Sequence, residues 1–149
     1  MNPSRRGLLK MLAGVAILAA YPLRVLADLV WPQAAFAVTD LDGVFAELGG
    51  VPPDSDLIQL DTPDIAENGA VVPVEVTSGI PGTSRIYLLV EKNPNPLSAG
   101  FDIPEGTDPY VATRVKVAQT CLIYAVVEAD GKFYKMGRET KVTLGGCGG

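Results

Sequence analysis

Short apolar runs separated by turn residues fill most of the chain after residue 56. Several of these runs alternate apolar and polar side chains, which is the period-two pattern of a strand with one buried face. Asp130-Gly131 lies between two runs and is a strong signal for a tight hairpin. The runs expected to form strands are residues 57–60, 71–77, 85–92, 97–103, 110–117, 120–129, 132–136 and 141–144.

The spacing of these runs predicts an all-β fold. Since no helical pattern lies between them, about seven short strands indicate an immunoglobulin-like antiparallel β-sandwich over residues 57–144. Pro73 falls inside the run 71–77 and has no N–H to donate to a ladder. We therefore expect this strand to be an edge strand or to be bulged at Pro73.

A helical pattern precedes the strands, within an N-terminal segment that covers residues 28–56. Thr39 is placed to cap this short helix, acidic residues suit its first turn, and Gly49-Gly50 ends it. The apolar positions at helical spacing are Leu41, Val44, Phe45 and Leu48. This stripe needs a partner surface, which is either the chain's own domain or another subunit.

Residues 1–27 have the pattern of an export signal. Arg5 and Arg6 stand directly before a short apolar run, and small residues follow it at Ala27 or, as the alternative exit, at Ala37. Paired arginines indicate the twin-arginine route, which carries folded proteins. The prediction is a cleaved signal peptide and a mature protein in a bacterial periplasm.

An uncleaved membrane anchor is the alternative for this segment. A bilayer span needs about 20 apolar residues. Lys10, Pro22 and Arg24 leave too few apolar residues between them. We therefore expect no membrane span after signal cleavage.

Charge and composition narrow the possible functions. Four of the 12 Lys and Arg residues and none of the 17 acidic ones lie in residues 1–27, so the remainder has 8 basic and 17 acidic side chains. Such an acidic surface repels phosphate backbones and argues against nucleic-acid binding. The chain has no histidine and two cysteines, which removes His-dependent catalysis and the common zinc sites. We expect no catalytic residue, no metal site and no cofactor site.

Two pairs of carboxylates could suggest a bound cation, Asp40 with Asp42 and Asp54 with Asp56. Neither pair has the full spacing of a calcium loop. A solvated surface is the preferred interpretation of both.

The most specific feature is the end of the chain, where Cys147 is flanked by Gly145, Gly146, Gly148 and Gly149. Glycine allows the widest range of backbone conformations and has no side chain to collide with an enclosing wall. From residue 144 to Cys147 an extended chain spans roughly 10 Å. Residues 145–149 are therefore predicted to form a flexible arm that can enter a pocket of another protein.

The thiol of Cys147 has no activating neighbour in the sequence. Lys141 is the nearest basic residue, and the terminal carboxylate of Gly149 disfavours the thiolate, so a pKa near ~8.5 or slightly higher is expected. An enzyme's nucleophile normally lies beside a base. An unactivated thiol on an arm instead indicates a carrier that other enzymes load and unload.

The tail has three alternative roles. Cys147 could form an internal disulfide with Cys121, although Cys121 lies in the middle of a predicted strand, as a small buried hydrophobe would. Cys147 could instead join two chains, as in an exported immunoglobulin-like interaction module. The Gly-Gly ending is also found in ubiquitin-like sulfur carriers, but these are cytosolic and are activated at the terminal carboxylate.

Four stretches of the sequence resemble the SoxY family, the sulfur-carrying subunits of the Sox system for thiosulfate oxidation. They are PDIAENGAVVPV at 63–74, NPNP at 93–96, ATRVKVAQT at 112–120, and KVTLGGCGG at 141–149. The Gly-Gly-Cys-Gly-Gly ending is the most specific of them. Cys121 is a departure, because a residue other than cysteine is expected there.

The resemblance implies a function and a set of partners. A SoxY-type subunit has an immunoglobulin-like sandwich, works as a heterodimer with a SoxZ-type subunit, and holds thiosulfate-derived adducts covalently on its tail cysteine, here Cys147. A cytochrome joins thiosulfate to the thiol, a hydrolase releases sulfate, and a sulfane dehydrogenase can oxidise the remaining sulfur. The carrier itself is then not an enzyme and needs no cofactor.

Overall fold

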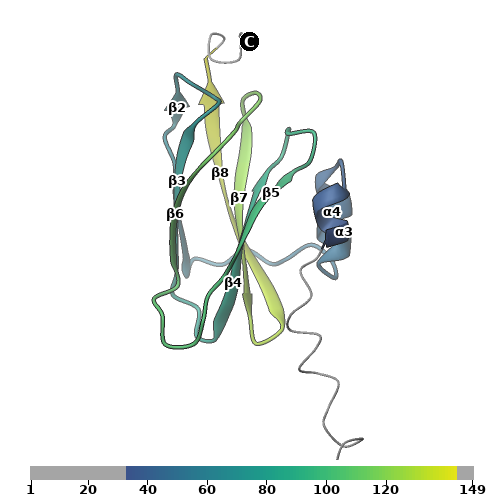
Figure 1. Cartoon of the computed structure of the whole chain (residues 1–149), viewed down its shortest axis with the longest axis vertical. Coiled ribbons are helices and arrows are strands. Elements are labelled where there is room, and N and C mark those ends of the chain that lie inside the picture. Colours follow the sequence, from purple (N-terminus) through teal and green to yellow (C-terminus); the bar gives the residue numbers. More distant parts are fainter. Residues whose placement is uncertain (1–32, 144–149) are drawn as a thin grey trace, which may run out of the picture. The chain divides into compact units, whose positions relative to one another are not determined.

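The structure, a computed structural model, describes residues 33–143. The predicted signal peptide and the predicted arm lie outside the described residues. Two β-sheets face each other, one of three strands in the order β1-β3-β6 and one of five in the order β2-β8-β7-β4-β5 (Figure 1). The strands are β1 (Ile58–Asp61), β2 (Ile65–Ala66), β3 (Val72–Ser78), β4 (Thr83–Val90), β5 (Leu97–Asp102), β6 (Tyr110–Val115), β7 (Cys121–Ala129) and β8 (Lys132–Val142).

The core lies between the two sheets, where alternate residues of each strand meet. In β3 the buried positions Val72, Val74 and Val76 alternate with exposed ones, as the period-two pattern predicts. They pack in one cluster with residues of the facing sheet such as Ile123 and Val127 of β7. The predicted sandwich is thus formed, and the pairings between its longer strands are antiparallel.

The last strand is longer than predicted. The expected runs 132–136 and 141–144 belong to one strand, β8, which pairs without interruption with β7 from Lys132 to Thr140. Gly137 lies in the middle of it, and a Cβ there would stand 2.7 Å from Cε1 of Tyr124. Glycine therefore lets an aromatic ring cross the strand without breaking it. The alternation of apolar and polar residues is interrupted at Gly137, although the backbone pairing of β8 with β7 continues through it.

A short strand lies between the predicted runs 57–60 and 71–77, where no strand was expected. Ile65 and Ala66 form β2, which pairs with Lys141 and Val142 in the parallel direction. A pairing of two residues has too little periodicity to be found in the sequence. It nevertheless places the segment 64–67 beside the end of β8.

Pro73 does not lie on an edge strand, because β3 is the central strand of its sheet. The register between β1 and β3 ends at the pair Asp61 and Glu75. The N–H of Gly79 donates to the carbonyl of Leu57, directly before β1, at 2.7 Å. Because alternate amides of a strand point the same way, the nitrogen of Pro73 also points to this side, past the last pair with β1. The prediction of an edge strand is wrong, and neither register of β3 shows a bulge at Pro73. The missing N–H of Pro73 nevertheless points to the side where no ladder bond is needed.

Two short helices, α3 (Gln33–Ala37) and α4 (Leu41–Glu47), precede the sheets. Asp40 caps α4 in place of the predicted Thr39, since its Oδ1 accepts the N–H of Gly43 at 2.7 Å. The buried ring of Phe45 meets Tyr124 of β7 edge-on, with ring centroids 6.1 Å apart. The apolar stripe of this helix therefore packs on the chain's own domain. Neither described helix is long and apolar enough to cross a membrane.

The segment between α4 and β1 runs beside β8. The N–H of Lys135 donates to the carbonyl of Pro53 at 2.9 Å, and the N–H of Ser55 donates to the carbonyl of Lys135 at 3.0 Å. The ammonium of Lys135 also pairs with the carboxylate of Asp54. One carboxylate of the pair considered for a cation thus has a lysine partner. No group of three potential ligands occurs anywhere in residues 33–143.

Candidate functional site

Cys147 and the four glycines around it lie outside the described residues. The structure describes the point from which this tail leaves the sandwich, here called the arm root and defined as Val142 and Thr143. Figure 1 shows the end of β8 beside β2, at the same end of the sandwich as the connection between β6 and β7. The contacts of these two residues decide how far the ordered strand extends toward the cysteine.

On one side, hydrogen bonds to the segment that contains β2 hold the arm root. The N–H of Lys141 donates to the carbonyl of Asp64 at 2.9 Å, and the N–H of Thr143 donates to the carbonyl of Ala66 at 3.2 Å. The hydroxyl of Thr143 donates to the carbonyl of Glu67 at 3.5 Å. The last strand is therefore paired as far as Thr143, two residues before Gly145.

On the other side, a threonine completes the ladder. β7 begins at Cys121, whose register partner on β8 is Thr140, so Val142 lies beyond the last pair. Its N–H donates instead to Oγ1 of Thr120 at 3.0 Å. Since a backbone N–H without a partner is costly when shielded from water, this hydroxyl stabilises the final residue of the strand.

A close backbone approach brings a third segment to the arm root. The N–H of Val117 donates to the carbonyl of Gly69 at 2.7 Å. A Cβ on Gly69 would lie 2.5 Å from the carbonyl oxygen of Val117 and 2.9 Å from Cγ1 of Val142. Only glycine fits this position without a shift of the backbone, so the loop before β3, the loop after β6 and the arm root pack directly together.

Asn93 ties the turn after β4 to the same loop. Its Nδ2 donates to the carbonyl of Lys116 at 2.7 Å, and its Oδ1 accepts the N–H of Ala118 at 3.1 Å. The stretches 63–74, 93–96 and 112–120, on which the resemblance rested, therefore meet at one end of the sandwich. No local pattern in these three stretches indicates that they lie together, because the contacts between them join residues far apart in the sequence.

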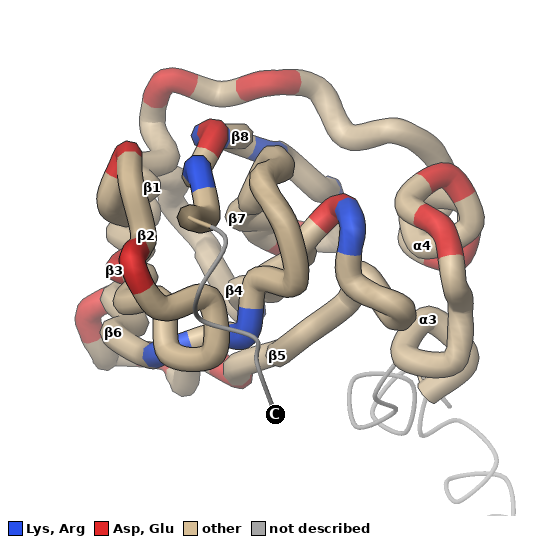
Figure 2. The backbone as a smooth tube through the Cα atoms, turned by 90° about the horizontal axis from the view of Figure 1, so that it is seen from above, with Lys and Arg blue, Asp and Glu red and all other residues tan. Residues whose placement is uncertain are grey.

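The surface around the arm root carries both signs of charge. Lys141 and Lys116 are exposed there, and so is Glu67. Figure 2, which looks onto this end of the molecule, shows blue and red segments along β8 and the neighbouring loops. Two apolar side chains of the same region are also exposed, Ile65 at 60% and Val71 at 51%. The surface around the arm root therefore presents positive charges, negative charges and apolar side chains together.

The second cysteine lies in a different environment. Cys121 is 4% exposed and belongs to the core cluster, as expected for a small buried hydrophobe, although it is the first residue of β7 and does not lie in the middle of the strand. Burial raises the pKa of its thiol, which keeps the sulfur protonated. A buried, protonated thiol is a poor nucleophile and cannot reach another protein. Cys121 therefore acts as a small hydrophobe in the core.

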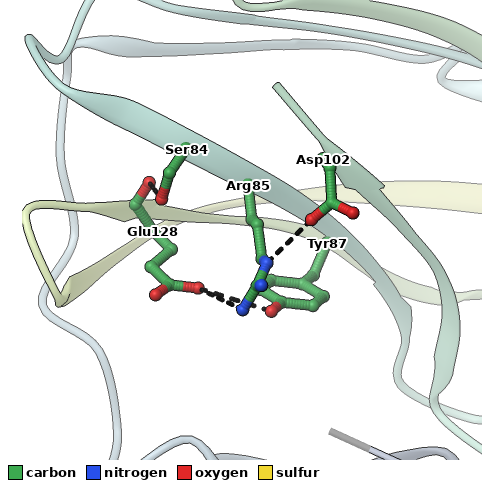
Figure 3. A network of polar contacts seen from close by, with 5 residues as sticks. All are labelled: Ser84, Arg85, Tyr87, Asp102 and Glu128. Atoms are coloured by element: carbon green, nitrogen blue, oxygen red, sulfur yellow. Dashed lines mark hydrogen bonds and ion pairs between the residues drawn. The ribbon is translucent and has the colours of Figure 1, made fainter. Parts of the chain in front are cut away.

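A polar network on β4, β5 and β7 lies toward the opposite end of the strands (Figure 3). Nε of Arg85 donates to Oδ1 of Asp102 at 2.8 Å, and its guanidinium lies 3.6 Å from Oε2 of Glu128. Tyr87 donates its hydroxyl to Glu128 at 3.4 Å, and Ser84 donates to the carbonyl of Glu128 at 3.3 Å. These bonds join three neighbouring strands.

The pKa values in this network are shifted by its own members. Burial lowers the pKa of Arg85, but the hydrogen bond to Asp102 raises it, and the net shift is upward. Burial and the nearby charge of Glu128 both raise the pKa of Tyr87. The tyrosine thus stays protonated and the arginine charged at neutral pH. This arrangement holds the three strands together.

Comparison with known proteins identifies the family. A family model described as "Sulfur oxidation protein SoxY" matches residues 45–147. The solved structure of the sulfur carrier protein SoxY from Chlorobium limicola f thiosulfatophilum is 41% identical and has a TM-score of 0.61, covering 69% of this chain and 94% of that chain. None of the curated protein sequences compared with this chain matches it.

A more distant neighbour shares only the fold. The superoxide reductase (neelaredoxin) from Ignicoccus hospitalis has a TM-score of 0.51 at 17% identity, covering 58% of this chain and 79% of that chain. The class that these observations define is an immunoglobulin-like β-sandwich with a cysteine near its C-terminal end. The chain belongs to the SoxY family of sulfur oxidation proteins, and the predicted fold class is confirmed.

Proposed function

We propose that this protein is a periplasmic, non-enzymatic carrier of sulfur intermediates in thiosulfate oxidation, with the thiol of Cys147 as the point of covalent attachment. The observation that carries the proposal is the family match, which extends through residue 147 and so includes the cysteine of the tail. The solved relative is itself described as a sulfur carrier protein. Export by the twin-arginine route, through Arg5 and Arg6, accounts for the periplasmic location.

The chemistry on the thiol balances only with partner enzymes. Loading joins the sulfane sulfur of thiosulfate to Sγ of Cys147, forming a cysteine S-thiosulfonate and releasing the thiol proton and two electrons, which a cytochrome accepts. Hydrolysis of the terminal S–S bond then consumes one water, releases sulfate and one proton, and leaves a cysteine persulfide, Cys–S–SH. Since the electron acceptor and the hydrolytic site belong to other proteins, this chain needs no redox centre of its own.

The contacts of the arm root support a carrier whose chemistry is done by partner enzymes. Hydrogen bonds on both sides hold β8 as far as Thr143, so the sandwich provides a firm base for the tail. Gly145, Gly146, Gly148 and Gly149 place no side chain beside the sulfur. We propose that this tail enters the active sites of the cytochrome, the sulfate-releasing hydrolase and the sulfane dehydrogenase in turn, while a SoxZ-type subunit binds the sandwich.

The decisive experiment measures adducts on the intact protein. The wild-type chain, Cys147→Ser and Cys121→Ser are incubated with thiosulfate and the partner cytochrome and analysed by intact-mass spectrometry. Thiosulfonate and persulfide adducts are expected on the wild type and on Cys121→Ser, and none on Cys147→Ser. Adducts that remain on Cys147→Ser would contradict the proposal.

Non-reducing electrophoresis tests the alternative of a structural disulfide. A carrier is expected to migrate mostly as a monomer with adducts, with an oxidised dimer as a minor form. A permanent dimer of the wild type that disappears in Cys147→Ser, together with the absence of any adduct, would favour the interaction module. Turnover of thiosulfate by the purified chain alone would instead make it an enzyme.

A further inference from the structure

Basic side chains without an ion-pair partner gather at the end of the sandwich from which the tail leaves. Within residues 33–143, Arg85, Lys135 and Arg138 each pair with a carboxylate. The basic residues for which no ion pair occurs in this range are all exposed: Lys92, Arg114, Lys116, Lys132 and Lys141. Lys132 lies in the β7–β8 hairpin, at the opposite end of the strands from the tail (Figure 1). Lys92, Lys116 and Lys141 are here called the arm-root lysines.

Two of the arm-root lysines directly precede residues that meet at Gly69. Lys141 comes before Val142 and Lys116 comes before Val117. A Cβ on Gly69 would lie 2.9 Å from Cγ1 of Val142 and 2.5 Å from the carbonyl oxygen of Val117. The two lysines therefore start from backbone segments that pack on the same glycine.

The third lysine is tied to the same loop through the turn after β4. Lys92 comes before Asn93, whose Nδ2 donates to the carbonyl of Lys116 at 2.7 Å. Figure 2, seen from this end, shows blue segments distributed around the end of the sandwich. Three exposed cations thus surround the point from which the tail extends.

The carboxylates at this end offset the lysines only in part. Asp64 pairs with Arg138 at 3.0 Å, and Glu91 accepts the N–H of Leu122 at 3.2 Å. Two further carboxylates of this region are exposed, Glu67 and Glu139. Residues 28–149 as a whole have 8 basic and 17 acidic side chains. The arm-root end is therefore much less negative than the rest of the chain.

This distribution of charge matters for a substrate that is itself negative. Thiosulfate carries two negative charges at neutral pH, and an acidic protein repels it. Four chain steps separate Thr143 from Cys147, so the cysteine lies within roughly 14 Å of the arm root. Since charges act over about 8 Å at physiological salt, and lysine side chains extend several ångströms from the backbone, the arm-root lysines affect anions that approach the tail.

We propose that Lys92, Lys116 and Lys141 attract anionic sulfur compounds to the tail and make the thiol of Cys147 selective for anionic over neutral reaction partners. This inference rests on the proposed function, since it assigns specificity-determining residues to the same thiol. It identifies the substrate class by charge. The lysines act through their field and take no part in bond formation.

Two small disulfides of different charge test the selectivity without any partner enzyme. Dithiobis(nitrobenzoate) carries two negative charges, and dithiodipyridine is neutral. With each reagent the thiolate of Cys147 displaces one aryl thiolate and forms a mixed disulfide, so no added oxidant is needed. Because both reagents react with the same thiolate, the ratio of their rate constants cancels any change in the thiolate fraction. Cys147→Ser gives the background reaction of Cys121.

The full-length wild type is compared with Lys92→Gln, Lys116→Gln, Lys141→Gln and the triple variant. At about 20 mM salt we expect each single substitution to lower the ratio of anionic to neutral rate constants about twofold, and the triple substitution about tenfold. At about 500 mM salt the differences are expected to disappear, because the charges are screened. A ratio that stays at the wild-type value in the triple variant at low salt would overturn the proposal.

Lys132→Gln is the matched control, since it removes the same charge at the opposite end of the strands. It is expected to leave the ratio unchanged. Circular dichroism checks that every variant is folded. An equal loss of selectivity in Lys132→Gln and in Lys141→Gln would show that only the net charge of the protein matters, and would contradict the assignment to the arm root.

Loading by the partner cytochrome separates this proposal from the carrier function. The triple variant is expected to load thiosulfate more slowly than the wild type at low salt, with the adduct still on Cys147. Slower loading with an unchanged reagent ratio would mean that the lysines bind the cytochrome, and would overturn their proposed action on the anion. The absence of adducts on the wild type would instead contradict the carrier function, whatever the reagent ratio.

Discussion

Cys121 lies in the core between the sheets, opposite Thr140 in the β7–β8 register, and almost none of its surface is exposed. Desolvation is the largest cause of the raised pKa of its thiol. A cysteine that carries cargo has to ionise and reach another protein's active site. At the residue scale, burial therefore removes one of the two sulfurs of this chain from the proposed chemistry.

The raised pKa of Cys121 predicts a pH-dependent stability. Its folded pKa lies above the unfolded value of about 8.5, so its contribution to the free energy of unfolding is full below that pH and is lost as pH rises through the folded pKa. Between pH 7 and pH 10 we expect the wild type to lose stability relative to Cys121→Ala, as measured by urea unfolding. Parallel losses in the two proteins would contradict this assignment.

The helix cap shows what the sequence can specify at this scale. Thr39 and Asp40 are both good capping residues, and the sequence alone favoured the first. The structure uses Asp40, because its backbone is extended and its carboxylate reaches the N–H of Gly43. The existence of the cap was predictable from residue type, while its position depended on the backbone path into the helix.

At the scale of elements, the end of β8 depends on partners that are distant in sequence. Thr143 bonds to Ala66 and Glu67, and Val142 bonds to Thr120. These contacts come from the short β2 and from the loop before β7. The pairing of the last described residues of β8 and of Thr143 therefore depends on two other segments of the chain.

Thr120→Val removes the acceptor of the Val142 N–H while keeping the shape of the side chain. We expect the free energy of unfolding to fall by about 1 kcal/mol, because a hydrogen bond is lost. The amide of Val142 should also exchange with deuterium faster than in the wild type, as measured by hydrogen-exchange NMR. Thr120→Ser keeps the hydroxyl and serves as the control. Unchanged exchange in Thr120→Val would show that this hydroxyl does not hold the arm root.

The differences between predicted and observed elements have a common physical cause. β8 continues through Gly137 because backbone pairing with β7 does not require an apolar side chain at every second position. β2 exists because the end of β8 offers it a partner. Both features depend on long-range pairing, which local periodicity does not encode. The longer strands were predictable because their alternating pattern reflects burial on one face.

At the scale of the whole molecule, residues 33–56 cover part of the outer face of the five-stranded sheet. Phe45 of α4 packs edge-on against Tyr124, and backbone hydrogen bonds tie Pro53 and Ser55 to Lys135 of β8. The apolar stripe of α4 is thus used within the chain. The sandwich and its N-terminal segment form one packed structure across these contacts.

Phe45→Ala tests this packing. Removal of a buried phenylalanine is expected to lower the free energy of unfolding by about 3–5 kcal/mol, through lost burial and a remaining cavity. Leu57→Ala, at a position 56% exposed, should change stability by no more than about 0.5 kcal/mol. Guanidinium unfolding measures both. Equal effects of the two substitutions would show that the helix does not stabilise the sandwich.

The chemistry proposed for this protein was determined by its sequence. A cysteine between four glycines, the absence of histidine and the alternating apolar runs are local properties of the chain, and they predicted a carrier-type tail on a β-sandwich. The tertiary structure decided where the segments 63–74, 93–96 and 112–120 meet, because contacts such as Gly69 with Val117 join residues far apart in sequence. Among the described residues, it also gave β6 a ladder partner on one side only, since strand order is a property of the assembled sheets and not of any single run.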